Sequence, residues 1–219
     1  MGKKAIIAGA SGLVGGELIK ILLEDPEYTE VLALVRTPLK LSHEKLNQIS
    51  VDFDKLDDYA HLITGNAIFC TLGSTQKKTP DLKVYRKIDH DYPVKLAEIA
   101  VANGIEQFHL TSSIGADIKS SNFYTKMKGE TEEDVKATAV EGIIIYRPSL
   151  LTGNRKERRF AEGLMQGLSK LINPLLVGGL RKYRSISAHT VATCMVKLSK
   201  TEVKGIYVYE SNDIQLTVS

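Results

Sequence analysis

One short stretch near the N-terminus decides the fold: Ala5-Ile6-Ile7-Ala8, followed directly by Gly9-Ala10-Ser11-Gly12-Leu13-Val14-Gly15. The first four residues form an apolar run that ends at a glycine, which predicts a buried β-strand closed by a tight turn. From Leu13 onward, apolar residues recur at helical spacing until Pro26 stops the pattern. The stretch therefore predicts a strand, a glycine turn and a helix.

The spacing of these glycines indicates what the turn binds. Gly9, Gly12 and Gly15 follow the pattern G-x-x-G-x-x-G, which differs in its first interval from the dinucleotide fingerprint G-x-G-x-x-G. Glycines let backbone N–H groups approach a pyrophosphate, and the helix N-terminus adds partial positive charge. We therefore favour a dinucleotide site over a purely structural turn. Its predicted residues are Gly9, Ala10, Ser11, Gly12, Leu13, Val14 and Gly15.

Strands and helices alternate along the rest of the chain. Apolar, β-rich runs predict further strands at residues 31–35, 46–51, 67–71, 107–112, 142–147 and 205–209. Helical patterns lie between most of them, at residues 55–62, 92–103, 122–138 and 190–199. Because such alternation requires crossover connections, it predicts a Rossmann-like α/β fold, a doubly wound parallel sheet covered by two layers of helix.

After Pro148 the pattern changes. A basic loop at residues 155–159 leads into an apolar helical stripe from Phe160 to Ile172. We interpret residues 151–185 as a small C-terminal cap on the substrate side of a single domain covering residues 1–219. Core packing is the commoner role for such a stripe, and a substrate lid, a dimer surface and a lipid-facing element are the alternatives.

Composition narrows the class of protein. The 219 residues suit one large α/β domain, and a net charge of +3 is too small to indicate a nucleic-acid partner. Cys70 and Cys194 are far apart in sequence and suggest buried thiols rather than a disulfide framework. With no signal peptide or membrane span visible, we expect a cytoplasmic protein without stable membrane anchoring. His109 and His189 lack partners at metal spacing, so no metal is expected.

The end of the second predicted strand bears on the choice of dinucleotide. A carboxylate there binds the ribose 2′-hydroxyl of NAD(H), whereas an arginine receives the 2′-phosphate of NADP(H). This sequence has Arg36 at that place, about 20 residues beyond Gly15, so NADP(H) is favoured over NAD(H); the alternative is a solvated loop arginine. Asp52, after the third strand, either contacts adenine or belongs to an ordinary turn.

A catalytic pair is suggested on the predicted helix at residues 122–138. Tyr124 and Lys128 stand at i and i+4, hence on one helix face, and a nearby ammonium favours the phenolate of a tyrosine that acts as an acid or base. Just upstream, Ser112 and Ser113 follow a strand at the carboxyl edge of the sheet, where ligands bind in such folds. Either serine could hold a substrate oxygen, or cap the next turn.

Several segments together resemble the TIP30-like group of atypical short-chain dehydrogenases/reductases, which includes bacterial members. They are residues 9–15, 111–117, 120–124 with 128–130, and 146–153. The resemblance covers nearly the whole chain. It implies a Ser-Tyr-Lys triad at Ser112 or Ser113, Tyr124 and Lys128, with Tyr124 as the acid and Lys128 also binding the nicotinamide ribose. It also implies that Leu72 and Gly73 line the cofactor and that Arg147 and Pro148 lie beside the nicotinamide.

Three functions are compatible with these residues. The first is an NADPH-dependent oxidoreductase acting on a small carbonyl compound, with Tyr124 as acid or base. The second is an NADPH-binding regulator that acts through a protein partner without turnover, as members of the resembling group are described. The third is an S-adenosylmethionine-dependent methyltransferase, in which Arg36 and the Tyr124/Lys128 pair have no natural role. The expected partners are a small-molecule substrate and a second copy or another protein, and no nucleic acid.

Overall fold

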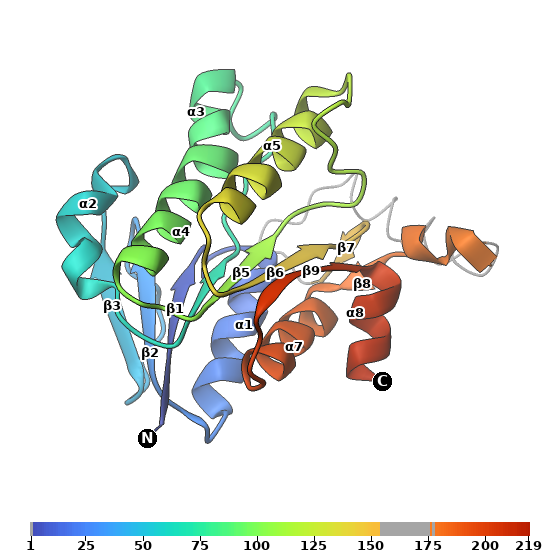
Figure 1. The fold of residues 1–219 in the computed structure, drawn as a ribbon. Coiled ribbons are helices and arrows are strands. Elements are labelled where there is room, and N and C mark those ends of the chain that lie inside the picture. Colours follow the sequence, from blue (N-terminus) through green and yellow to red (C-terminus); the bar gives the residue numbers. More distant parts are fainter. Residues whose placement is uncertain (1, 154–175, 177) are drawn as a thin grey trace.

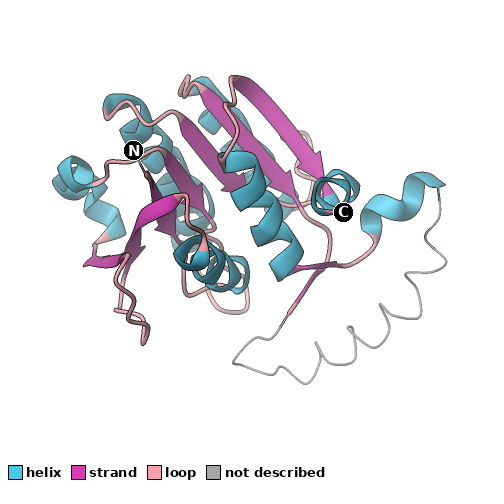
Figure 2. Cartoon of the chain, turned by 90° about the horizontal axis from the view of Figure 1, so that it is seen from below, coloured by secondary structure: helices cyan, strands magenta, loops and turns pink. Residues whose placement is uncertain are grey.

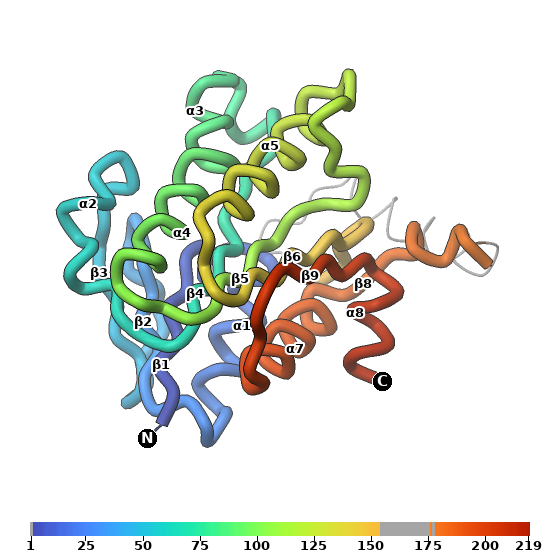
Figure 3. The backbone as a smooth tube through the Cα atoms, in the orientation of Figure 1, coloured from blue at the N-terminus to red at the C-terminus, as the bar shows by residue number. Residues whose placement is uncertain are grey.

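The computed structural model describes residues 2–153, 176 and 178–219, and its centre is a seven-stranded parallel sheet. The strand order is β3-β2-β1-β4-β5-β6-β9, and every pairing is parallel. The strands are β1 (Lys3–Ala8), β2 (Tyr28–Val35), β3 (Leu46–Ser50), β4 (Ala67–Cys70), β5 (Gln107–Thr111), β6 (Gly142–Arg147) and β9 (Gly205–Glu210). The order reverses beside β1, so the carboxyl ends of β1 and β4 form the point at which such sheets bind ligands. β4 is the central strand of the sheet, and β1 lies beside it (Figure 3).

Helices cover both faces of this sheet (Figures 1 and 2). One layer holds α1 (Leu13–Glu24), α7 (Ala188–Ser199) and α8 (Ser211–Val218). The other holds α2 (Leu56–Tyr59), α3 (Leu82–Arg86), α4 (Tyr92–Ala102) and α5 (Phe123–Ala137). The sequence prediction of a Rossmann-like doubly wound parallel sheet is therefore confirmed.

Each face of the sheet has its own apolar core, because successive strand residues point to opposite sides. Ile7, Phe69 and Tyr146 pack towards the layer of α1 and α7, together with Leu18 and Val191. On the other face, strand residues pack with the helices α2, α4 and α5; they include Ile6, Ile68, Leu110 and Ile145. Both clusters are almost fully excluded from water, so the carboxyl edge of the sheet is rigidly supported.

Two helices were not expected from the sequence. The chain from Leu82 forms α3 and runs through a π-helical segment, η3 (Lys87–Asp91), directly into α4. Asp81 begins this long helical stretch by accepting hydrogen bonds from the backbone of Lys83 and Val84. The short helix α8 begins with a capping box, in which the side chains of Glu210 and Asp213 each accept a hydrogen bond from the other residue's backbone N–H.

The expected cap at residues 151–185 falls largely outside the described residues, as does the expected helix between Phe160 and Ile172. Its described parts are β7 (Leu151–Thr152), which pairs with β8 (Ile186–Ser187), and a 3-10 segment, η5 (Gly178–Tyr183). Within the described ranges, no helix is both long and apolar enough to cross a membrane.

Candidate functional site

The glycine turn after β1 is shaped by close packing against the end of β4. Gly9 has a φ of +95°, and a Cβ there would lie 2.7 Å from the carbonyl carbon and oxygen of Thr71. A Cβ on Gly15 would overlap the carbonyl oxygen of Gly9. These two glycines are therefore required by the tertiary structure, whatever the turn binds.

The N-terminus of α1 is open to an anion. Gly12 is its N-cap and supplies no side-chain cap, and the first turn carries no acidic residue. The backbone N–H of Gly12 donates to Gly9 over 2.9 Å, which holds the turn in shape. Free backbone N–H groups and the positive end of the helix dipole suit a pyrophosphate.

A solvent-open cleft of about 110 Å³ lies over this turn. Its walls come from the turn itself, from the ends of β2 and β4, and from the helical stretch before α4. The lining residues are Gly9, Ala10, Ser11, Gly12, Leu34, Val35, Arg36, Phe53, Thr71, Leu72, Gly73, Ile88 and Tyr92. The structure thus brings the predicted turn together with Arg36, Leu72 and Gly73. Val14 instead packs in the core, and Leu13 packs against it.

Arg36 and Asp52 have different surroundings. Arg36 lines the cleft at the end of β2 and is exposed. Asp52 is the N-cap of a short 3-10 segment, η1 (Phe53–Lys55), and accepts a hydrogen bond from the backbone of Asp54 over 3.1 Å. Of the two alternatives for Asp52, the structure shows the turn role, and its neighbour Phe53 is the residue that lines the cleft.

Two aromatic rings at this end of the cleft were missed by sequence reasoning. The rings of Phe53 and Tyr92 are 5.4 Å apart between centroids, and both line the cleft. The Tyr92 hydroxyl donates to Asp54 over 2.9 Å, and burial together with this bond raises the pKa of Tyr92 to about 12. The rings provide a flat apolar wall, and the residues come from segments 39 positions apart that only the fold brings together.

Tyr124 and Lys128 lie on α5, which begins at Asn122, whose side chain accepts hydrogen bonds from the backbone of Tyr124 and Thr125. Tyr124 is half-buried, and Lys128 is buried. Burial lowers the pKa of Lys128, but the negative charges of Asp89 and of an ionised Tyr124 outweigh it and raise that pKa overall. Lys128 is therefore a buried ammonium that interacts electrostatically with Tyr124.

Asp89, which sequence reasoning missed, is the counter-ion of this lysine. Its Oδ1 lies 3.0 Å from Lys128 Nζ, and only 1% of its side chain is exposed. Its Oδ2 accepts a hydrogen bond from the backbone N–H of Ser74 over 2.7 Å, directly after the cleft residue Gly73. In the sequence, Lys87-Ile88-Asp89-His90-Asp91 looks like a solvated charged segment. The π-helical geometry of η3 turns Asp89 inward.

The two candidate serines differ in their hydrogen bonds. Ser112 is buried and donates to Glu132 Oε1 over 2.5 Å. Glu132, itself fully buried, also accepts from Arg147 Nε over 2.9 Å. Ser113 is half-exposed, and its hydroxyl donates only a long 3.3 Å bond to the Ile114 carbonyl. Ser113 is thus the serine available to a ligand.

Arg147 and Pro148 have structural contacts of their own. The Arg147 guanidinium is engaged by Glu132, which raises the pKa of Arg147. The Pro148 carbonyl accepts a hydrogen bond from the backbone of Ile114 over 3.0 Å. Both residues therefore hold the loop that carries Ser113. Sequence reasoning also missed Glu132, although its position four residues after Lys128 is visible in the sequence.

The loop between β5 and α5 folds back onto the helix that carries Tyr124. Its Asp117 donates a backbone hydrogen bond to the Thr125 carbonyl over 3.0 Å, and the hydroxyls of Ser120 and Thr125 are 2.6 Å apart. A Cβ on Gly129 would lie 2.5 Å from the backbone of Asp117, so this approach requires glycine. The loop's contacts explain how a short interval between the serines and Tyr124 is accommodated.

The residues fit a nicotinamide dinucleotide, because a turn with closely packed glycines, a helix N-terminus without a side-chain cap and an adjoining cleft occur together. Among the described residues, no group of three histidine, cysteine or acidic side chains could hold a metal ion.

Comparison with known families agrees with this geometry. A model of an NAD(P)H-binding family matches residues 9–202. Protein HTATIP2 of Rattus norvegicus, the TIP30 protein, is 37% identical over 166 residues, covering 74% of this chain and 68% of that protein. The mitochondrial protein fmp52 of Emericella nidulans is 33% identical over 224 residues, covering 95% and 96%.

Solved structures show the same fold. The WbmH enzyme of Bordetella bronchiseptica, in complex with NAD+, has a TM-score of 0.71 at 16% identity, covering 95% of this chain and 75% of that one. The ADP-L-glycero-D-manno-heptose-6-epimerase of Helicobacter pylori has a TM-score of 0.71 at 18% identity, with 97% and 80% covered. At such identities the likeness concerns the fold alone.

The comparisons also correct one expectation. Several fungal relatives are named as mitochondrial proteins, which contradicts the cytoplasmic location expected from the sequence. Cys70 and Cys194 are free and buried, and a buried thiol does not distinguish one compartment from another. The rat and fungal relatives give no support to a bacterial source. By its family match and by its identity to HTATIP2 and FMP52, the chain belongs to the NAD(P)H-binding family as an atypical, TIP30-like short-chain dehydrogenase/reductase.

Proposed function

We propose that this protein is an NADP(H)-dependent oxidoreductase that transfers hydride to or from a small carbonyl or alcohol substrate, with Tyr124 as acid or base. The observation that carries the proposal is the buried ammonium of Lys128 on the same helix face as Tyr124, held in place by Asp89. A fixed positive charge beside a half-buried phenol stabilises the negative charge that develops on its oxygen during proton transfer.

The other residues have complementary roles in this proposal. A bound nicotinamide dinucleotide supplies or accepts the hydride. The N–H groups at the start of α1 bind its pyrophosphate, and Arg36 receives the 2′-phosphate. Ser113 donates a hydrogen bond to the substrate oxygen, because Ser112 is already committed to Glu132.

Proton transfer then follows from the arrangement on α5. Tyr124 gives its phenolic proton to the substrate oxygen as negative charge develops there, and the resulting phenolate faces the Lys128 ammonium. Lys128 keeps its proton, because Asp89 raises its pKa. Gly9 and Gly12 line the cleft without side chains, which allows close approach of the dinucleotide backbone.

A second candidate is an NADPH-binding regulator without turnover, and one observation favours it. The Asp89 carboxylate lies 3.0 Å from Lys128 and cancels part of the positive charge that Lys128 would otherwise provide for proton transfer at Tyr124. This function requires NADPH binding but no NADPH consumption, so the two candidates differ in a measurable way.

The cofactor claim is tested first, by calorimetric titration of NADPH and NADH into the wild type and Arg36→Ala. We expect the wild type to prefer NADPH, and Arg36→Ala to weaken NADPH binding by at least about tenfold with little effect on NADH, because a charge-assisted contact is lost. Lys40→Ala removes the same charge from an exposed residue outside the cleft lining and serves as the control. Equal affinities in the wild type would contradict the NADP(H) preference.

Turnover is tested next, by following NADPH absorbance with a panel of small aldehydes and ketones. Tyr124→Phe should abolish NADPH consumption but leave NADPH binding intact. Turnover is compared per folded molecule for the serine variants, and Ser113→Ala should lower it far more than Ser112→Ala. Binding of NADPH without consumption across the panel would favour the regulator instead.

A further inference from the structure

The sheet ends on one side at β9, whose outer edge pairs with no other strand of the described residues. β9 pairs with β6 and forms the border of the sheet in front of β6 in Figure 1. Its residues Ile206, Tyr207 and Val208 are 50%, 47% and 40% exposed. At the opposite border, the side chain of Gln48 in β3 binds the backbone of Leu39 in the preceding loop, so that edge is partly covered. An open apolar edge strand is rare in a chain that stays monomeric.

The hydrogen-bond pattern shows which backbone groups of β9 are open. The N–H of Gly205 donates to the Glu141 carbonyl of the neighbouring strand over 2.7 Å. By the alternation of a parallel ladder, Gly205, Tyr207 and Tyr209 face β6, whereas Ile206 and Val208 direct their N–H and C=O groups outward. No hydrogen bond among the described residues uses these outward groups.

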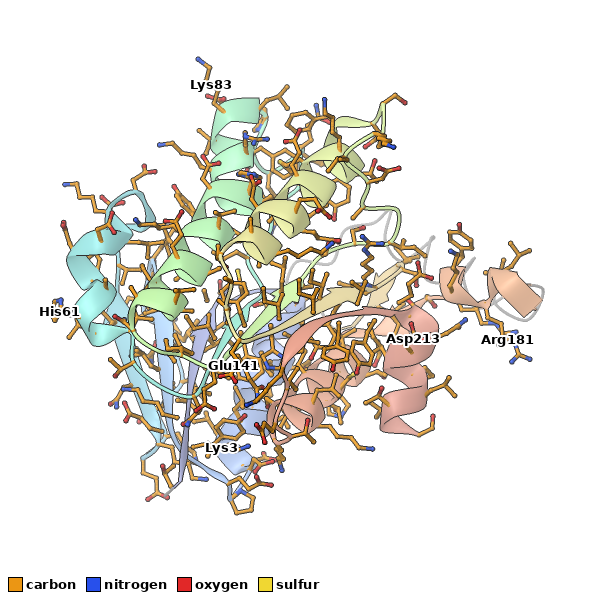
Figure 4. All side chains as sticks on the ribbon, in the orientation of Figure 1. Lys3, His61, Lys83, Glu141, Arg181 and Asp213 are labelled. Carbon is orange, nitrogen blue, oxygen red and sulfur yellow. The ribbon has the colours of Figure 1, made fainter. Side chains whose placement is uncertain are left out.

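The open segment has a defined end. The next outward N–H belongs to Glu210, and it already donates to Asp213 Oδ2 over 2.9 Å in the capping box of α8. Asp213 is labelled beside this end of the strand in Figure 4. Ile206 and Val208 therefore supply two donors and two acceptors, with no further pairing beyond them at the C-terminal end.

We propose that β9 binds β9 of a second copy of this chain in antiparallel register, with Tyr207 opposite the partner's Tyr207. In this register Ile206 lies opposite the partner's Val208, and Val208 lies opposite the partner's Ile206. Each of these two pairs exchanges two N–H···O=C bonds, so all outward groups of both copies are satisfied by four hydrogen bonds.

Charge favours the same register. Lys204 comes to lie opposite the partner's Glu210, and the symmetric contact repeats this on the other side. Lys204 is exposed and now binds Glu141 and Glu202, at 3.0 and 3.1 Å; Glu141 is labelled in Figure 4. A register shifted to place Ile206 opposite the partner's Ile206 would set Glu210 against the partner's Glu202, and the outward groups of Ile206 and Val208 would then form only two hydrogen bonds with one another. Charge repulsion and lost bonding both disfavour it.

Apolar packing adds to the contact. Ile206 and Val208 lie beside Ile143 and Ile145 of β6, on the sheet face that packs against α5. The paired strands would extend this apolar strip across both copies, and Tyr207 would meet the partner's Tyr207 on the other face. Such facing aromatic and β-branched pairs stabilise antiparallel sheets.

The first test is sedimentation equilibrium of the full chain over a micromolar to millimolar range. The wild type should form a concentration-dependent dimer. Val208→Pro removes an outward N–H that the β6 ladder does not use, so the fold persists while the dissociation constant rises at least about tenfold. Val208→Thr keeps the N–H and should stay within about threefold of the wild type. A wild type that is monomeric throughout would overturn the proposal.

A disulfide test examines the register. Tyr207→Cys should cross-link to a dimer on mild oxidation, since residues opposite each other in this pairing have Cα atoms about 4.5 Å apart. Ile206→Cys should not, because its copies are offset diagonally by more than disulfide reach. The native Cys70 and Cys194 are buried, so the wild type measures the background cross-linking. Equal cross-linking of the two variants would exclude this register.

Discussion

The ion pair between Lys128 and Asp89 is the strongest determinant at the scale of single residues. Both side chains are almost fully buried, so each charge depends on the other. Asp89→Asn keeps the shape but leaves a buried ammonium without its counter-ion. We expect the free energy of unfolding to fall by about 3 kcal/mol. The double variant Asp89→Asn/Lys128→Met should recover part of that loss, and urea unfolding at pH 7 measures both.

The same pair gives a pH dependence with a definite sign. The pKa of Lys128 is raised above its usual 10.5, so the folded chain binds this proton more tightly than the unfolded chain. Its contribution to stability is full below about pH 10.5 and is lost as pH rises through the raised pKa. The wild type should therefore lose stability relative to Lys128→Met only above that pH. If the difference in unfolding free energy between the wild type and Lys128→Met already changed between pH 7 and 9, this prediction would be contradicted.

At the scale of elements, the start of α1 offers a matched pair of glycines. A Cβ on Gly15 would overlap the Gly9 carbonyl oxygen, whereas a Cβ on Gly16 would meet its nearest atom, the Ala10 carbonyl oxygen, at 3.7 Å. Gly15→Ala should destabilise the chain by about 2 kcal/mol and weaken NADPH binding. Gly16→Ala should be neutral or stabilising by up to about 1 kcal/mol, since alanine favours helix. Thermal unfolding and calorimetric titration compare the two, and similar losses in both variants would count against this packing argument.

Strong periodicity made most elements visible in the sequence, and the exceptions have physical causes. The strand at residues 142–147 is an almost continuous apolar run, and the helix at residues 123–137 begins at a specific side-chain cap, Asn122. The helix α3 is mostly exposed and has no apolar face long enough to recognise, and its continuation through η3 is set by packing on α5. The helix α8 is short, and its signal was the Glu210/Asp213 capping box rather than periodicity.

At the scale of the whole molecule, dinucleotide binding should stabilise the fold. The cleft joins the ends of β1, β2 and β4 to the start of α1, so a ligand there contacts several elements at once. At a concentration 100 times its dissociation constant, NADPH should add about 2.7 kcal/mol, or roughly 5–10 °C in Tm for a chain of this size. Differential scanning fluorimetry should show this shift for the wild type and Tyr124→Phe alike, and a much smaller one for Arg36→Ala. No shift with either nucleotide would contradict the proposed cofactor site.

The sequence by itself determined the succession of the seven sheet strands and most of the helices along the chain, the glycine turn and the position of Tyr124 four residues before Lys128, because these depend on local spacing. Only the tertiary structure decided which groups are free to act. It committed Ser112 to Glu132, gave Lys128 its counter-ion Asp89 from a distant segment, and left the outer edge of β9 without a partner strand among the described residues. Such contacts join residues that are many positions apart, and burial and pairing across the fold leave no periodic signal in the chain.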